Sequence, residues 1–187
     1  VNTPSFTLVN PTKIGYTFIG WTGTNVNELT IELTVEEGSV GNRTYVANWK
    51  KNSYNISYDL QESIVIEEEV SNANYGDTIR LTIDAKEGYN NLVIKVVDAN
   101  DETNVISESA TFVVPAFDVK VIATAEVVEY TISYSLNGGE VANENVTTYT
   151  VETPSFTLVN PTKVGHTFLG WKGTGIIGTK ENVTIEE

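Results

Sequence analysis

A single histidine is the residue in this chain best suited to act as a general base or to hold a metal ion. It is His166, and the chain has no cysteine to serve as a nucleophile or thiolate ligand. Imidazole suits both roles because it titrates near neutral pH. The matching position of an internal repeat, however, holds Tyr16. The position therefore favours an aromatic structural side chain, and a Ser-His-Asp arrangement is not predicted.

Clustered carboxylates are the second candidate for chemistry, because glycoside hydrolysis needs only two of them. They occur at residues 36–37, 67–69 and 98–102. Each module of the chain has roughly 75 residues, which is small for a cleft enzyme, so solvated faces and turns are favoured. The segment 98–102, with Asp98, Asp101 and Glu102, could offer oxygen ligands to calcium but lacks the spacing of an EF-hand loop. We therefore predict no catalytic residue, no metal site and no cofactor.

Three tryptophans suggest a carbohydrate platform, since sugars stack on exposed rings. Trp21 and Trp171 each follow a Phe-x-Gly sequence at matched positions. Strict strand alternation would put Trp21 on the face of Ile19, opposite to that of Phe18. A repeated aromatic residue at one module position is more typical of a core than of a ligand platform. The predicted structural core of the repeat comprises Phe6, Phe18, Trp21, Trp49, Phe156, Phe168 and Trp171. These residues without Trp49, together with Leu8 and Leu158, are expected to be the best-buried set or close to it.

The composition narrows the possible partners. The chain has 11 Lys+Arg against 25 Asp+Glu in 187 residues, a net charge of −14, which disfavours nucleic-acid binding. No apolar run approaches the roughly 18 residues that a membrane-spanning helix needs. Hydrophobic residues make up 40% of the chain, enough to bury a core. Repulsion between the acidic modules favours an extended arrangement of the chain.

An internal repeat divides the chain into modules. Residues 1–37 and 151–187 align without a gap, and 22 of the 37 positions are identical. A shorter echo relates residues 54–60 to residues 130–136. The repeat predicts a type A module lacking its first strand, a type B module, and a type A module lacking its last strand. Their predicted boundaries are 1–50, 51–128 and 129–187.

The patterns of the sequence predict a mainly β fold, α+β at most. Residues 130–136 alternate apolar and polar side chains, and Asn137-Gly138 follows as a hairpin-turn signal. Residues 64–70 are compatible with a short helix or a strand. The other predicted strands are 44–49, 77–84, 92–97, 110–114, 119–125, 147–151, 155–159 and 167–171.

The end modules carry the motif Asn-Pro-Thr-Lys-x-Gly-x-Thr-Phe-x-Gly-Trp, at residues 10–21 and 160–171. With the strand 130–136 and the closing Tyr-Val-Ala-Asn-Trp, this motif resembles the internalin B-repeat (Listeria–Bacteroides repeat) family. The middle module, with Gly76-Asp77 and the segment 110–121, is similar to divergent members. The resemblance implies small β-grasp (ubiquitin-like) modules in tandem, in secreted, wall-associated bacterial proteins.

These observations predict a non-catalytic segment of a bacterial cell-surface or secreted protein, extracellular and associated with the cell wall. Its expected role is that of an adhesin stalk or spacer. The alternatives are a module that binds host protein or glycan and, less favoured, an accessory region of a carboxylate-based hydrolase. The incomplete end modules also predict strand exchange: residues 130–139 would pair with residues 1–50, within one molecule or between neighbours.

Overall fold

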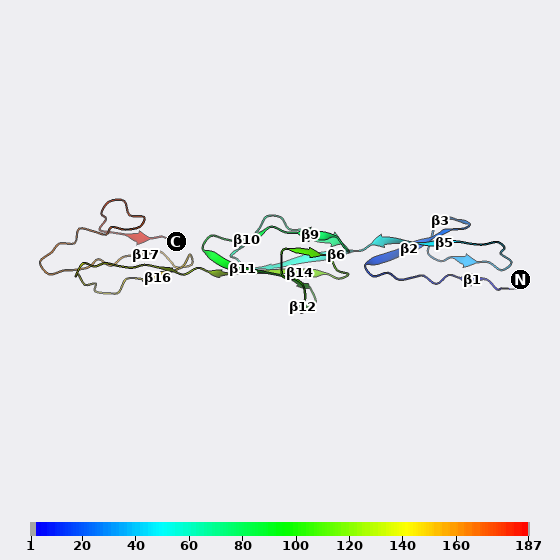
Figure 1. The fold of residues 1–187 in the computed structure, drawn as a ribbon, viewed down its shortest axis with the longest axis horizontal. Coiled ribbons are helices and arrows are strands. Elements are labelled where there is room, and N and C mark those ends of the chain that lie inside the picture. The colour runs from blue at the N-terminus through cyan, green and yellow to red at the C-terminus, as the bar shows by residue number, and fades with distance from the viewer. Residues whose placement is uncertain (1–2, 187) are drawn as a thin grey trace. The chain divides into compact units, whose positions relative to one another are not determined.

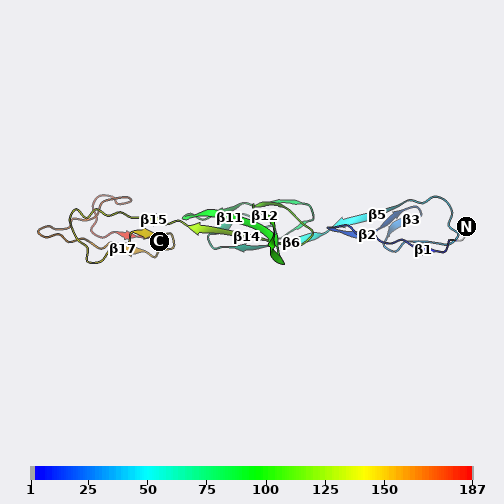
Figure 2. The same cartoon turned by 60° about the horizontal axis from the view of Figure 1, so that its bottom comes forward.

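The chain folds into β-strands and connecting turns. The computed structural model describes residues 3–186, in which 18 strands and no helix occur. The residues form two compact units. Unit 1 runs to Ala85 and includes Leu92–Thr124, and unit 2 combines Lys86–Asn91 with the residues from Ala125 onward. The prediction of a mainly β fold is confirmed (Figures 1 and 2). The β-grasp assignment and the three module boundaries stay predictions.

The first end module is built around β2 (Tyr16–Gly23). This strand pairs antiparallel with β3 (Val26–Thr30) on one side and with β5 (Tyr45–Lys51) on the other. A second small ladder joins β1 (Phe6–Thr7) to β4 (Thr34–Val35). The predicted strand 44–49 therefore exists as β5, and it lies at an edge of its sheet.

A β-bulge in β2 determines which face its aromatic side chains occupy. Phe18 lies opposite Trp49 and Gly20 lies opposite Asn48, so Ile19 is an extra residue. An extra residue reverses the alternation of side chains beyond it. The rings of Phe18 and Trp21 consequently lie on one face, with centroids 5.3 Å apart. The expectation that Trp21 shares a face with Ile19 rather than with Phe18 is wrong for this reason.

The bulge depends on a glycine, which gives a first testable prediction. Gly20 has φ +133°, and a Cβ there would lie 2.9 Å from the backbone nitrogen of Thr30. Gly38 also has a positive φ, +77°, but no atom lies within 4 Å of its Cβ position. We expect Gly20→Ala to destabilise the protein by about 1–3 kcal/mol more than Gly38→Ala, since relieving such an overlap shifts backbone. Urea unfolding of both variants measures this, and equal losses would contradict it.

The middle module contains the largest sheet, with the order β12-β11-β14-β6-β8. The first strand of the middle module, β6 (Ser53–Leu60), and the last strand of this module, β14 (Val119–Val127), are parallel neighbours in the sheet. The remaining strands of this sheet are β8 (Asn72–Asn74), β11 (Tyr89–Asp98) and β12 (Asp101–Ser107). Two further ladders join β7 (Ile64–Ile66) to β10 (Ile83–Ala85) and β9 (Thr78–Arg80) to β13 (Thr111–Val113).

The deepest burial lies in the middle module. The largest side chains with almost no exposed surface are Val96, Val97, Val114, Val119 and Val121. The expectation that the aromatic residues of the end modules form the best-buried set is therefore wrong. The buried side chains of the middle module lie in or next to the strands of a five-stranded sheet and two further ladders, whereas the end modules have fewer strands and leave their rings partly uncovered. Phe6 is 48% exposed, whereas Trp171 is only 8% exposed. The other predicted core rings are half-buried: Phe18, Trp21, Trp49, Phe156 and Phe168.

The second end module has short ladders. They join β15 (Tyr130–Thr131) to β16 (Thr148–Tyr149) and β17 (Phe156–Thr157) to β18 (Thr184–Ile185). The predicted strand 130–136 is thus shortened, and 167–171 forms only a single bridge from Trp171 to Lys180. The segments that match them in the other modules form eight-residue strands: β6 contains the match of 130–136, and β2 contains the match of 167–171. The predicted turn is confirmed, with Asn137 at φ 51° and Gly138 at φ 79°.

Candidate functional site

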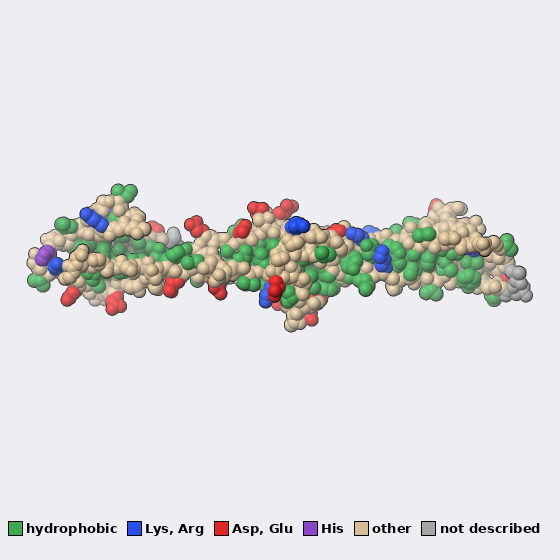
Figure 3. All heavy atoms as spheres, in the orientation of Figure 1, with side chains coloured by type: hydrophobic (Ala, Val, Ile, Leu, Met, Phe, Trp, Pro, Cys, Tyr) green, Lys and Arg blue, Asp and Glu red, His purple; other side chains and the backbone are tan. Residues whose placement is uncertain are grey.

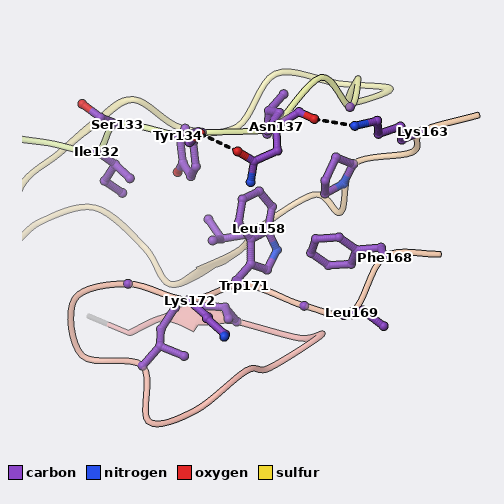
Figure 4. Close-up of a pocket in the computed structure, with 18 of the residues that line it drawn as sticks. Ile132, Ser133, Tyr134, Asn137, Leu158, Lys163, Phe168, Leu169, Trp171 and Lys172 are labelled. Atoms are coloured by element: carbon purple, nitrogen blue, oxygen red, sulfur yellow. Dashed lines mark hydrogen bonds between the residues drawn. The ribbon is translucent and has the colours of Figure 1, made fainter. Parts of the chain in front are cut away.

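A hollow lies in unit 2. It has a volume of about 830 Å³ and lies between the segments 131–137 and 166–176. Aromatic and aliphatic side chains from both segments, and from the strand region near Leu158, line it (Figure 4). Ser133, Thr167 and Lys172 add polar groups at its margin. The hollow therefore combines apolar side chains with segments of extended backbone.

Trp171 is the best-buried aromatic residue of this hollow. Its indole Nε1 donates a hydrogen bond of 2.9 Å to Oδ1 of Asn160. Its ring meets those of Phe168 and Tyr134 edge to face, at centroid distances of 5.5 Å and 5.8 Å. The Tyr134 hydroxyl donates to the carbonyl oxygen of Val146 at 2.7 Å, and burial raises the pKa of Tyr134. These contacts hold the tryptophan as a structural side chain rather than an exposed sugar platform.

The first end module contains the same tryptophan arrangement. Trp21 Nε1 donates to Oδ1 of Asn10 at 3.0 Å, and Phe18 packs edge to face on Trp49 with centroids 5.6 Å apart. The ammonium group of Lys13 lies 3.9 Å from the centroid of the Tyr16 ring. This hydrogen bond was not predicted from the sequence, although the motif places an asparagine eleven residues before each tryptophan.

His166 lies at the rim of the hollow and is exposed. Its Nδ1 is 3.0 Å from the carbonyl oxygen of Val164, two residues earlier in the chain. This is a local contact of a turn. The backbone N–H of His166 donates to the Lys163 carbonyl, as that of Tyr16 does to Lys13. The two copies thus use histidine and tyrosine at the same structural position.

The acidic cluster at residues 98–102 forms a turn and an ion pair. An oxygen of Asp98 accepts the N–H of Asn100 at 2.9 Å, and Glu102 pairs with Lys120 at 2.7 Å. Hydrogen bonds from Thr103 hold the pKa of Asp101 below its usual value. Within residues 3–186, no group of three or more His, Cys, Asp or Glu side chains could hold a metal ion. On the visible face, acidic side chains stand at separate points (Figure 3).

Comparison with known proteins identifies both end modules. Residues 130–185 match the Listeria-Bacteroides repeat domain, and residues 5–53 match the divergent InlB B-repeat domain. Both end modules therefore match B-repeat family models, as the sequence indicated. The divergent domain falls on the first end module, and the assignment of the middle module to the divergent type stays a prediction.

One relative extends across the modules. A protein of Evansella cellulosilytica, whose description reads "Putative membrane protein", is 31% identical over 173 residues. The match covers 86% of this chain but only 23% of that protein, so the chain spans less than a quarter of its relative. No solved structure matches the chain. The described residues include no helix that is long and apolar enough to cross a membrane.

Proposed function

We propose that this chain is a non-catalytic repeat segment of a bacterial cell-surface or secreted protein, and that it serves as a stalk or spacer. The observation that carries this proposal is a joint between modules whose contacts recur in the chain. A spacer needs joints of defined geometry, because a flexible linker would let the modules collapse on one another.

The first joint lies within unit 1, where Asn52 is the single residue between β5 and β6. The backbone N–H of Asn52 donates to the Gly15 carbonyl at 2.9 Å, and its carbonyl accepts the N–H of Tyr75 at 2.9 Å. Gly15 has φ +74°, and its Cα packs against the Tyr75 ring so closely that a Cβ would overlap it. The joint thus needs a glycine for both conformation and space.

A charged pair flanks this first joint. Lys51 Nζ donates to Oδ1 of Asp77 at 3.2 Å. This hydrogen bond from Lys51 is the main reason why the pKa of Asp77 lies below its ordinary value. A lowered carboxyl pKa stabilises the folded state above the unfolded-state pKa, and the contribution is lost as pH falls through the folded-state pKa. The pair is exposed, so we expect it to orient the joint rather than to stabilise it strongly.

The second joint lies within unit 2. Two of its residues, Val128 and Val151, lie 76 positions after Asn52 and Tyr75 of the first joint. The N–H of Val128 donates to the Gly88 carbonyl at 2.8 Å. Gly88 has φ +84°, and a Cβ there would overlap the side chain of Val151. The Tyr89 hydroxyl donates to Glu152 at 2.8 Å. In both joints a glycine with positive φ accepts a backbone hydrogen bond from the other side of the joint. This repetition supports a repeated mechanical role.

The spacer proposal predicts that Gly15→Ala loosens the first joint. The test places spin labels on β3 and β12, two strands of unit 1, and measures the distribution of distances between them by pulsed electron resonance. We expect a clearly broader distribution for Gly15→Ala. Gly76→Ala is the matched control, because Gly76 has φ +79° but no atom within 4 Å of its Cβ position. A broad distribution in the parent protein, or no broadening in Gly15→Ala, would refute the proposal.

The same proposal locates the segment outside the cell, in association with the cell wall, as part of an adhesin. Its support is the match of the end modules to B-repeat family models and the repetition of modules and joints. Binding of the middle module to host protein or glycan is the alternative role. Titration of the chain against arrays of glycans and matrix proteins tests that role directly.

A further inference from the structure

We propose that the hollow of unit 2 is a strand acceptor, which binds one extended segment with the sequence pattern of residues 44–50, Thr-Tyr-Val-Ala-Asn-Trp-Lys. The bound strand would run parallel to residues 131–136 and antiparallel to residues 166–173. This inference concerns a binding site and does not depend on the spacer role. Two other parts of the chain show such a strand seated at the equivalent place.

The first precedent is the edge of strand β6 in the middle module. Ile56 donates its N–H to the Ser71 carbonyl at 2.9 Å, and Ile132 donates to the Thr147 carbonyl at 2.8 Å, both pairs of positions differing by 76. The hydroxyl of Tyr58 contacts the Val70 carbonyl as that of Tyr134 contacts Val146. The first strands of the two modules therefore occupy the same structural position.

The opposite edge of β6 carries β14 as a parallel neighbour. Val119 lies opposite Ile56, and Val121 lies opposite Tyr58. In the second end module the equivalent residues, Ile132 and Tyr134, line the hollow. Within the described residues no strand pairs with this edge. An extended segment with such an edge is a ready template for another strand.

The second precedent is strand β2 of the first end module, where β5 is the antiparallel neighbour. The two end modules match at positions that differ by 150. Phe6 pairs with Val35 as Phe156 pairs with Ile185, and the Trp21–Asn10 hydrogen bond recurs as Trp171–Asn160. The segment equivalent to β2 should therefore accept a neighbour equivalent to β5.

The register of β5 predicts how the strand would lie. In the first module Trp49 is opposite Phe18, Ala47 opposite Trp21 and Tyr45 opposite Gly23. By the same offset, these residues of the bound segment would face Phe168, Trp171 and Gly173, all of which line the hollow. Tyr45, Ala47 and Trp49 occupy every second position, so their side chains lie on the same face of a strand.

One strand can serve both edges, because β14 in the middle module does so. It lies between β6 and β11 in the sheet order. The site therefore calls for a peptide backbone with aromatic side chains on one face, rather than a sugar or another small molecule. Main-chain hydrogen bonds would supply affinity, and the hollow would select alternate side chains, as in other cases of strand addition.

The test uses the full chain and a labelled peptide with the sequence of residues 41–51. We expect saturable one-to-one binding by fluorescence anisotropy and slower amide exchange at 131–135 and 170–173. A peptide with Trp49→Ala should bind about tenfold more weakly or worse, as for an interface anchor. A peptide with Ala47→Pro should not bind, because proline removes a ladder donor.

Variants of the chain locate the site. Phe168→Ala should weaken peptide binding, whereas Val164→Ala should not, because Val164 is 98% exposed and does not line the hollow. Amide exchange at Phe156 and Thr157 checks that each variant is folded. If the parent chain forms a dimer that the peptide dissociates, the acceptor is supported and a second copy is one source of the strand. No binding, equal binding of the Ala47→Pro peptide, or protection only outside unit 2 would overturn the proposal.

Discussion

Replacing Trp171 with alanine is expected to lower the free energy of unfolding of unit 2 by about 3–5 kcal/mol, the usual loss for a large buried aromatic side chain. The side chain is 8% exposed and packs on Phe168 and Tyr134. Its removal also leaves Asn160 without the indole donor. Because whole domains are stable by only about 5–15 kcal/mol, this variant would leave unit 2 close to unfolded.

Leu169→Ala is the matched control for this variant. Leu169 lies two residues earlier in the same segment, but its side chain is 78% exposed, so we expect a loss of less than about 0.5 kcal/mol. Amide exchange at β16, β17 and β18 reports the stability of unit 2. Similar exchange rates in the two variants would show that Trp171 is not part of a core. That result would favour the carbohydrate-platform role for the tryptophans.

Phe112→Ala should produce a loss of similar size in unit 1, about 3–5 kcal/mol. Phe112 lies on β13 opposite Ile79 of β9 and is 4% exposed. The neighbouring Val113 points to the other face of the strand and is 55% exposed. Val113→Ala should therefore cost less than about 0.5 kcal/mol. Urea unfolding followed by circular dichroism measures both variants, and a small loss for Phe112→Ala would place the core of the middle module elsewhere.

The sequence allowed the repeats and most strands to be predicted, because both are local properties. The repeat of residues 1–37 at an offset of 150 predicts the matched ladders at Phe6 and Phe156. The alternating pattern predicts β5, β11, β13 and β14. Residues 64–70, for which helix and strand were both open, contain β7. Strand 77–84 is divided into β9 and β10.

Other features could not be predicted, because they depend on partners distant in the chain. The face of Trp21 follows from a bulge against β5, which a local alternation rule cannot see. The depth of burial follows from how many strands pack together: the middle module combines a five-stranded sheet with two further ladders, so its valines are more deeply buried than the aromatic residues of the end modules. Segments 130–136 and 167–171 have strand-forming sequences yet form only a two-residue ladder and a single bridge, because each is paired along one edge only within the described residues.

The most direct test of this account is to extend the chain after Glu187 with a second copy of residues 38–51 and to measure amide exchange by mass spectrometry. If the end modules are copies of one fold that a closing strand completes, exchange at 166–173 should slow to the rate of β2, and the melting temperature of unit 2 should rise. An extended chain with unchanged exchange at 166–173 and an unchanged melting temperature would contradict the account.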